Sequence, residues 1–201
     1  MNRDHWESIH ALKQDQVSWY QDRPTLALDF IRACELHPGA TALDAGSGAS
    51  RMVEALLELG LKVTVADIAQ SALDRVRERL GDRAGEVAFL RADLAKDELP
   101  AAAFDLWHDR AVFHFLTEPA DRAAYLATMT RSLRPGGFAV LACFAPDGPK
   151  KCSGLPVRRY DAAGLEVELG PGFELLDEGR ESHATPFSTT QAFTVTRFRR
   201  T

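Results

Sequence analysis

Short apolar runs alternate with amphipathic segments along most of the chain. Apolar runs predict strands that begin at Thr41 and then at 61–66, 87–90, 104–108 and 138–144. Between them, apolar residues recur every three or four positions, which is the spacing of one helix face. That spacing predicts helices over 24–36, from Met52 to Leu57, and over 72–80, 118–133 and 161–169. Strands that alternate with helices in this way are typical of an α/β fold.

Composition limits the classes of protein to consider. The chain has 201 residues, 45% hydrophobic and 26% charged, which suits one globular domain. A formal charge of −5 argues against general binding to nucleic acid or to an anionic membrane, because both favour a basic surface. We therefore expect neither as a partner. The sequence leaves the oligomeric state open.

The cysteines and the absence of an apolar leader bear on location. Three widely spaced cysteines suit a reducing compartment better than a disulfide framework, and their spacing does not match a zinc site. We expect no metal. No apolar run approaches the roughly 20 residues of a membrane span, and no leader pattern opens the chain. We expect a cytoplasmic protein.

A glycine-rich turn follows the first predicted strand. Gly46 and Gly48 can take backbone angles that side chains forbid, and a ligand can lie directly against their main chain. A dinucleotide fingerprint would require a third glycine where Arg51 stands, and no Gly-Lys-Ser/Thr follows to make a phosphate-binding loop. Asp44, just before the turn, suits a ligand with an ammonium group better than one with phosphates, because two anions would repel each other.

At this point the chain resembles the class I, seven-strand S-adenosylmethionine-dependent methyltransferases. Their first motif is an apolar strand followed by acid-x-Gly-x-Gly-x-Gly, and here it reads Asp-Ala-Gly-Ser-Gly-Ala-Ser over 44–50. Ser50 replaces the last glycine and could instead cap the following helix. The family commonly carries a Leu-x-Pro-Gly-Gly turn before its fifth strand, and 133–137 match it. The resemblance covers about 38–200.

The resemblance implies a single-domain three-layer αβα sandwich. Its sheet has seven strands and is mostly parallel, and an antiparallel hairpin at the carboxyl end completes it; the strand-like runs 173–181 and 191–199 fit that hairpin. Within the one domain, we expect an amino-terminal lid and first helices over 1–37 and the cofactor-binding core over 38–201.

The implied cofactor is S-adenosyl-L-methionine, with S-adenosyl-L-homocysteine as product. Asp67 lies about 20 residues beyond the glycine turn, where nucleoside-binding α/β proteins place an acid on the ribose hydroxyls; the alternative is an acid that caps the next helix. In the family, an acid and an apolar residue after the third strand contact adenine, and Asp93 and Leu94 match them; the alternative is a plain turn acid. The cofactor-binding residues that we expect are Asp44, Gly46, Ser47, Gly48, Asp67, Ile68, Asp93, Leu94, Trp19 and Tyr20.

Trp19 and Tyr20 enter this set as lid residues. Aromatic residues in a polar amino-terminal segment often fold over a pocket. In the family, this segment covers cofactor and substrate, so both residues are also candidates for acceptor binding. The alternative is that they attach a terminal helix to the core.

Polar residues at the end of the fourth predicted strand are the leading acceptor contacts. His108, Asp109 and His114 are candidates for positioning the acceptor or acting as a base, and Arg110 for binding it. The alternatives are a structural Asp–Arg ion pair and a core histidine. The long Gly- and Pro-rich stretch 145–159 should rim the same pocket, with Arg158 and Tyr160 near its end as further acceptor contacts.

Three functions remain open at this stage. The first is methyl transfer to a nitrogen, sulfur or oxygen nucleophile of a small molecule, and the second keeps the cofactor but uses a protein lysine as acceptor. The third is a nucleotide- or NAD-binding α/β protein that transfers no methyl group. Asp109-Arg110-Ala111 resembles the Asp-Lys/Arg-Gly of small protein-lysine and thiol methyltransferases, with alanine in place of glycine.

Overall fold

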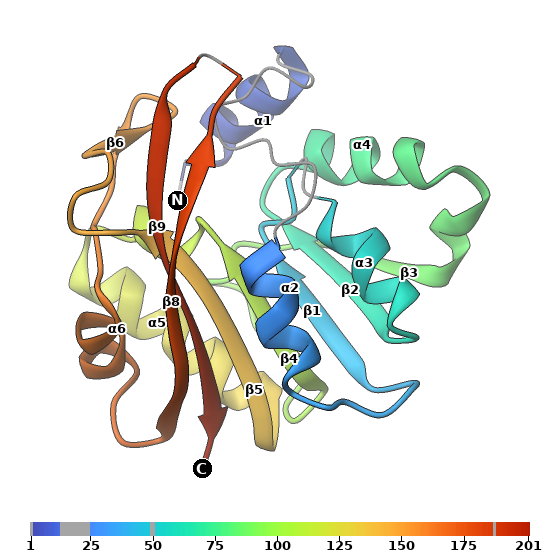
Figure 1. Ribbon diagram of the computed structural model, residues 1–201. Coiled ribbons are helices and arrows are strands. Elements are labelled where there is room, and N and C mark those ends of the chain that lie inside the picture. The colour runs from blue at the N-terminus through green and yellow to red at the C-terminus, as the bar shows by residue number, and fades with distance from the viewer. Residues whose placement is uncertain (1, 13–24, 49–50, 187) are drawn as a thin grey trace.

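Seven strands form one mixed sheet in the order β3-β2-β1-β4-β5-β9-β8 (Figure 1). The computed structural model of the chain describes residues 2–12, 25–48, 51–186 and 188–201. Strands β1 to β5 pair in parallel, and β9 runs antiparallel to both β5 and β8. The strands are β1 (Thr41–Ala45), β2 (Lys62–Asp67), β3 (Val87–Arg91), β4 (Phe104–Arg110), β5 (Leu133–Phe144), β8 (Phe173–Ala184) and β9 (Thr190–Arg200). The predicted α/β class, seven-strand sheet and terminal antiparallel hairpin are confirmed.

Helices cover both faces of the sheet and make the three layers. On one face, α3 (Met52–Glu58) packs on β1 and β2, α4 (Gln70–Leu80) packs on β2 and β3, and α2 (Thr25–Arg32) packs on β5 and β9. On the other face, α5 (Pro119–Ser132) and α6 (Ala162–Leu169) pack on β4, β5 and β9. The remaining helices are α1 (Arg3–Leu12) and the short 3₁₀ turns η1 (Gly81–Glu86) and η2 (Phe113–Phe115).

The predicted elements differ from the observed ones mainly at their ends. The helix expected over 24–36 is α2 and ends at Arg32, and the strand expected from Phe138 begins at Leu133. Within 145–159 the chain forms a small hairpin of β6 (Lys151–Cys152) and β7 (Leu155–Pro156), which the sequence pattern did not indicate. Two-residue strands carry too few side chains to show an alternation of apolar and polar positions.

The Pro-Gly-Gly turn is built into the start of β5 as a bulge. Phe104 of β4 pairs with Leu133, and the next pair joins Leu106 to Phe138, so the turn residues lie between two ladder positions. A Cβ atom on Gly137 would lie 2.9 Å from the carbonyl oxygen of Arg134 and 3.0 Å from that of Asp105. Glycine is required there because two backbone oxygens leave no room for a side chain.

Gly137→Ala should therefore lower the free energy of unfolding by roughly 1–3 kcal/mol, the usual cost of forcing an extra methyl group into a packed site. Gly172→Ala is the matched control, because a Cβ at Gly172 meets nothing within 4 Å. Urea unfolding followed by circular dichroism measures both. Equal stability of the two variants would show that the bulge relaxes without cost.

Candidate active site

A cleft opens at the carboxyl ends of the parallel strands, beside the turn that follows β1. This is the edge where open α/β sheets bind ligands. Most of the lining is apolar, and the charged residues in it are Asp67 and Arg110. The described residues that line the cleft are Trp6, His10, Gly46, Gly48, Ala66, Asp67, Ile68, Ala92, Leu94, Arg110, Ala111, Val112, Phe115 and Cys152.

The glycine turn is in direct contact with the turn after β4. Gly46 has φ +61°, and a Cβ atom on it would lie 2.0 Å from Cγ2 of Val112. Its amide donates to the carbonyl of Ala66 at 2.7 Å. A side chain at Gly46 would therefore displace Val112 as well as strain the backbone.

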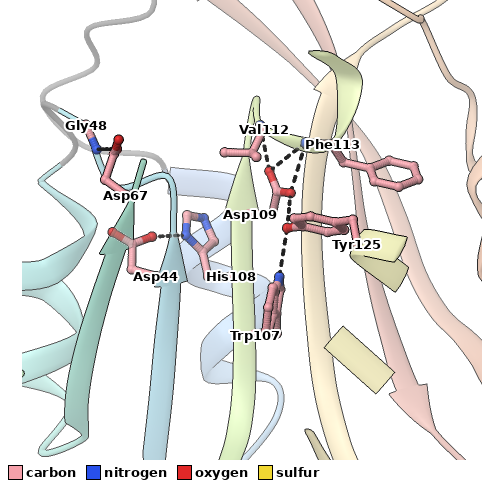
Figure 2. A network of polar contacts seen from close by, with 9 residues as sticks. All are labelled: Asp44, Gly48, Asp67, Trp107, His108, Asp109, Val112, Phe113 and Tyr125. Carbon is pink, nitrogen blue, oxygen red and sulfur yellow. Dashed lines mark hydrogen bonds and ion pairs between the residues drawn. The ribbon is translucent and has the colours of Figure 1, made fainter. Parts of the chain in front are cut away.

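Asp67 connects the end of β2 to the glycine turn. Its Oδ2 accepts the amide of Gly48 at 3.1 Å (Figure 2). Its Oδ1 accepts the amide of Ala69 at 2.9 Å. Burial raises the pKa of Asp67 to about 6, although the two amide hydrogen bonds lower it. Asp67 is therefore a buried acid in the cleft wall at the end of β2, and its binding to a ribose stays a prediction.

Asp44 and His108 form a buried pair across β1 and β4. The two residues are register partners in the sheet, and His108 Nδ1 donates to Asp44 Oδ1 at 2.6 Å (Figure 2). Each is about 1% exposed. Asp44 Oδ2, His108 Nε2 and the nearby Ser47 Oγ are buried without a hydrogen-bond partner in the structure as described. Buried polar atoms in proteins are nearly always paired, so these three indicate that a ligand or water completes the site.

Asp109 faces into the protein and holds the turn after β4. Its Oδ1 accepts the amide of Val112 at 2.8 Å, and its Oδ2 accepts the amide of Phe113 at 3.0 Å and the hydroxyl of Tyr125 at 2.5 Å. Tyr125 in turn accepts the indole N–H of Trp107 at 2.9 Å (Figure 2). Burial raises the pKa of Asp109 to about 6, opposed by the hydroxyl of Tyr125 and the turn amides. With both oxygens occupied and no place in the described cleft lining, Asp109 has the geometry of a positioning residue rather than of the base considered above.

The turn places Arg110 and Ala111 in the cleft wall. Ala111 has φ +72°, a left-handed conformation that costs a residue with a Cβ atom of order 1–3 kcal/mol. Its amide donates to Ala142 at 2.9 Å. This is the position where the resembling Asp-Lys/Arg-Gly pattern has glycine, so the backbone shape is that of a glycine although the residue is alanine.

His114 lies behind Arg110, outside the described cleft lining. The amide of Phe144 donates to its Nδ1 at 3.3 Å, so Nδ1 carries no proton. Burial, and then the charge of Arg110, lower the pKa of His114 to about 3. The imidazole is neutral at pH 7 and a weak base.

Helix α1 closes the cleft from the amino-terminal side. The Glu7 carboxylate accepts the amides of Gln70 at 2.7 Å and Ser71 at 3.0 Å and the Ser71 hydroxyl at 2.7 Å, so it caps α4. Burial works against ionisation of Glu7, but the hydrogen bonds from Ser71 and Gln70 lower its pKa overall. This cap fixes α1 over the loop that follows Asp67.

Two side chains of α1 reach the cleft. Trp6 packs on Ile68 and lies edge-on to Phe115 with ring centroids 4.9 Å apart. His10 lies beside the glycine turn, 3.3 Å from where a Cβ on Gly48 would be, and burial followed by the charge of Arg75 lowers its pKa to about 4. The sequence indicated neither residue, because nothing local distinguishes them from an ordinary helix. The other members of the lining that were not predicted as site residues are Ala66, Ala92, Ala111, Val112, Phe115 and Cys152.

The other predicted cofactor-binding residues fall into three groups. Gly46, Gly48, Ile68 and Leu94 line the cleft as expected. Asp93 is buried in the wall between Ala92 and Leu94 and caps its own turn by accepting the amide of Ala95 at 3.1 Å. Trp19 and Tyr20 lie outside the described residues.

Arg158 and Tyr160 are not brought to the cleft. They line a separate hollow beside α6, where Arg158 is paired with Glu168 at 3.2 Å. The Tyr160 hydroxyl is buried without a partner, and burial raises its pKa above the ordinary range. This placement gives no support to an acceptor role for either residue.

No group of three or more His, Cys, Asp or Glu side chains that could hold a metal ion occurs in the described ranges. Cys34, Cys143 and Cys152, all among the described residues, are buried and are not joined in disulfides. None of the described helices combines the length and the apolar character that a bilayer crossing requires.

Comparison with known proteins agrees with the fold and the cleft. A family described as a methyltransferase domain matches residues 42–137. The chain is 30% identical over 148 residues to malonyl-[acyl-carrier protein] O-methyltransferase of Serratia marcescens, covering 74% of this chain and 49% of that protein. It is 31% identical over 133 residues to the cypemycin N-terminal methyltransferase of a Streptomyces species, covering 66% and 51%. The chain thus spans about half the length of these relatives.

A solved structure is similar over nearly the whole chain. It is the 1,6-didemethyltoxoflavin-N1-methyltransferase of Burkholderia thailandensis, with bound 1,6-didemethyltoxoflavin and S-adenosylhomocysteine. The TM-score is 0.77 at 25% identity, covering 99% of this chain and 87% of that one. The chain belongs to the class I S-adenosylmethionine-dependent methyltransferases.

Tyr125→Phe should destabilise the protein by about 1–3 kcal/mol, because it removes one of the buried donors to Asp109 and leaves the indole N–H of Trp107 without its acceptor. The Tyr125 hydroxyl favours ionised Asp109, so its loss should cost more above pH 6 than at pH 5, where the folded protein holds the Asp109 proton. Urea unfolding at the two pH values measures this.

Tyr160→Phe is the matched control, since it removes a buried hydroxyl that has no partner. Two results would contradict a network centred on ionised Asp109. One is a loss of unfolding free energy in Tyr125→Phe that is no larger than in Tyr160→Phe, and the other is an equal loss at both pH values.

Proposed function

We propose that the protein transfers a methyl group from S-adenosylmethionine to a nitrogen, sulfur or oxygen nucleophile of a small molecule. The observation that carries this is the cleft itself, in which a glycine turn and the acid Asp67 lie at the ends of β1 and β2 beside the turn after β4. The named relatives are an O-methyltransferase and an N-terminal methyltransferase, and the similar Burkholderia structure holds 1,6-didemethyltoxoflavin.

The residues present fit this cofactor. The unpaired Oδ2 of Asp44 and the unpaired hydroxyl of Ser47 can accept hydrogen bonds from an ammonium group. Asp67 can accept from the two ribose hydroxyls, and Gly48 leaves the main chain open to the ligand. Leu94 and Ile68 supply apolar walls for a flat base, next to the buried Asp93.

The sulfonium of the cofactor supplies a methyl group that is already activated. The acceptor's lone pair forms a bond to the methyl carbon while the carbon–sulfur bond breaks, and the electron pair of that bond goes to sulfur. The protein's part is to hold the acceptor in line and exclude water, since orientation alone lowers such barriers by several kcal/mol. The rigid turn of Arg110, Ala111 and Val112, held by Asp109, fixes one side of the acceptor's approach.

The alternative acceptor is a lysine side chain of a protein. Incubation with S-adenosylmethionine labelled at the methyl group, together with a cell extract, separates the two. Label in small molecules supports the proposal, and label in precipitable protein supports the alternative. Binding of NAD without binding of S-adenosylmethionine would contradict both.

Asp67→Asn should weaken S-adenosylhomocysteine binding by roughly 1–3 kcal/mol, because an amide replaces an ionised acceptor. Since the pKa of Asp67 is about 6 in the free protein, affinity of the unaltered protein should fall as the pH drops below 6, and the variant should lack this dependence. Calorimetric titration at several pH values measures both effects. Asp82→Asn, on the exposed η1 turn, is the control and should bind as the unaltered protein does.

A further inference from the structure

Arg110 is the cation in a cleft wall that is otherwise largely apolar. Its neighbours in that wall include Ala111, Val112 and Phe115. It stands at the end of β4, where the acceptor must meet the methyl group if the proposed function holds. Its guanidinium lies over the ring of Phe193, 4.6 Å from the centroid, which holds the planar group in one orientation.

The guanidinium remains charged despite its surroundings. Burial lowers the pKa of Arg110 to about 10, and the charges of Glu181 and Cys152 act in the opposite direction. At neutral pH the group is therefore a cation with little water around it. A cation in such a place binds an anion more strongly than one on the surface, because the interaction is poorly screened.

Three polar side chains of this region are poorly suited to act as a base. His10 and His114 have pKa values near 4 and 3, so they are neutral and hold a proton weakly. Both oxygens of Asp109 are occupied by the turn amides and Tyr125. None of these three would readily take the proton of an acceptor that arrives with one.

We propose that the methyl acceptor is an anion, or a group that ionises readily, and that its charge is held by Arg110. Carboxylates, phenolates, thiolates and acidic heterocyclic N–H groups belong to this chemical class. The inference rests on the proposed function and specifies its acceptor. In the transfer, the anion's electron pair forms the new bond to carbon, and the pair of the broken bond neutralises the sulfonium. Two opposite charges thus become two neutral products, and no proton has to move.

Arg110 favours the anion over the neutral product. Its effect should therefore be on acceptor binding and on release of the methylated product, rather than on the barrier. The methylated product is neutral, so the guanidinium of Arg110 forms no ion pair with it. The product therefore leaves the cleft more readily than the anionic acceptor would.

The test compares two ligands of the same shape that differ in charge, 2-naphthoate and 2-naphthamide. Each is titrated calorimetrically into the protein saturated with S-adenosylhomocysteine. Naphthoate should bind at least about tenfold more tightly than naphthamide, the ratio expected for one hydrogen-bonded ion pair. Arg110→Gln should remove this preference, and Arg110→Lys should keep part of it. S-adenosylhomocysteine affinity should be the same in all three proteins.

Arg158→Gln is the control, because Arg158 lies in the separate hollow and should leave the preference intact. The proposal is overturned if the unaltered protein does not prefer naphthoate, if the preference survives in Arg110→Gln, or if it is lost in Arg158→Gln. A loss of S-adenosylhomocysteine affinity in Arg110→Gln would instead assign the guanidinium to the cofactor. Failure of the proposed function is a separate result, because the unaltered protein would then not bind S-adenosylhomocysteine.

Discussion

The carboxylate of Asp109 is the interaction on which the acceptor side of the cleft depends. It is fully buried, and its donors come from two places: the turn after β4 and Tyr125 of α5. A buried carboxylate without donors would be very costly, so the turn amides must stay where they are. This constraint holds Ala111 in its left-handed conformation and points Arg110 into the cleft. Helix α5 supplies none of the described residues that line the cleft, yet its Tyr125 helps to fix the shape of the cleft.

The cofactor side is organised by a second set of carboxylates. Asp67 ties the glycine turn to β2, and Glu7 ties α1 to the start of α4. In both cases the acceptor is an acid and the donors are backbone amides, which are rigid and cannot be altered by mutation of their side chains. Trp6 and His10 reach the cleft only because Glu7 fixes their helix. Helix α1 and the loop that follows Asp67 are therefore both held at the start of α4.

The sequence located the cleft residues beside β1, β2 and β3 better than those of the turn after β4. Gly46, Asp67 and Leu94 lie at or shortly after the ends of strands, and strand ends can be located from local apolar patterns. The seven-strand, mostly parallel sheet came from the family resemblance, and the terminal hairpin from its two strand-like runs. Arg110 became a candidate for the same reason, because it lies at the end of the fourth predicted strand.

The side-chain roles that local sequence patterns could not predict depend on contacts between segments far apart in the chain. Asp109 was considered as a base, and its donors include Tyr125, sixteen positions away on another element. Arg158 follows a loop expected to rim the cleft, but its ion pair with Glu168 holds it beside α6. His10 and Trp6 have no sequence signal, because their role is set by where α1 docks.

The contact between Gly46 and Val112 has a consequence for how this chain can vary. A side chain at one position occupies the space that the other uses, so the two residues share one fixed volume. Larger residues at 46 require smaller ones at 112, and the left-handed backbone at Gly46 restricts the exchange further. In a set of related sequences, the sizes of these two residues should be inversely correlated, although 66 positions separate them along the chain.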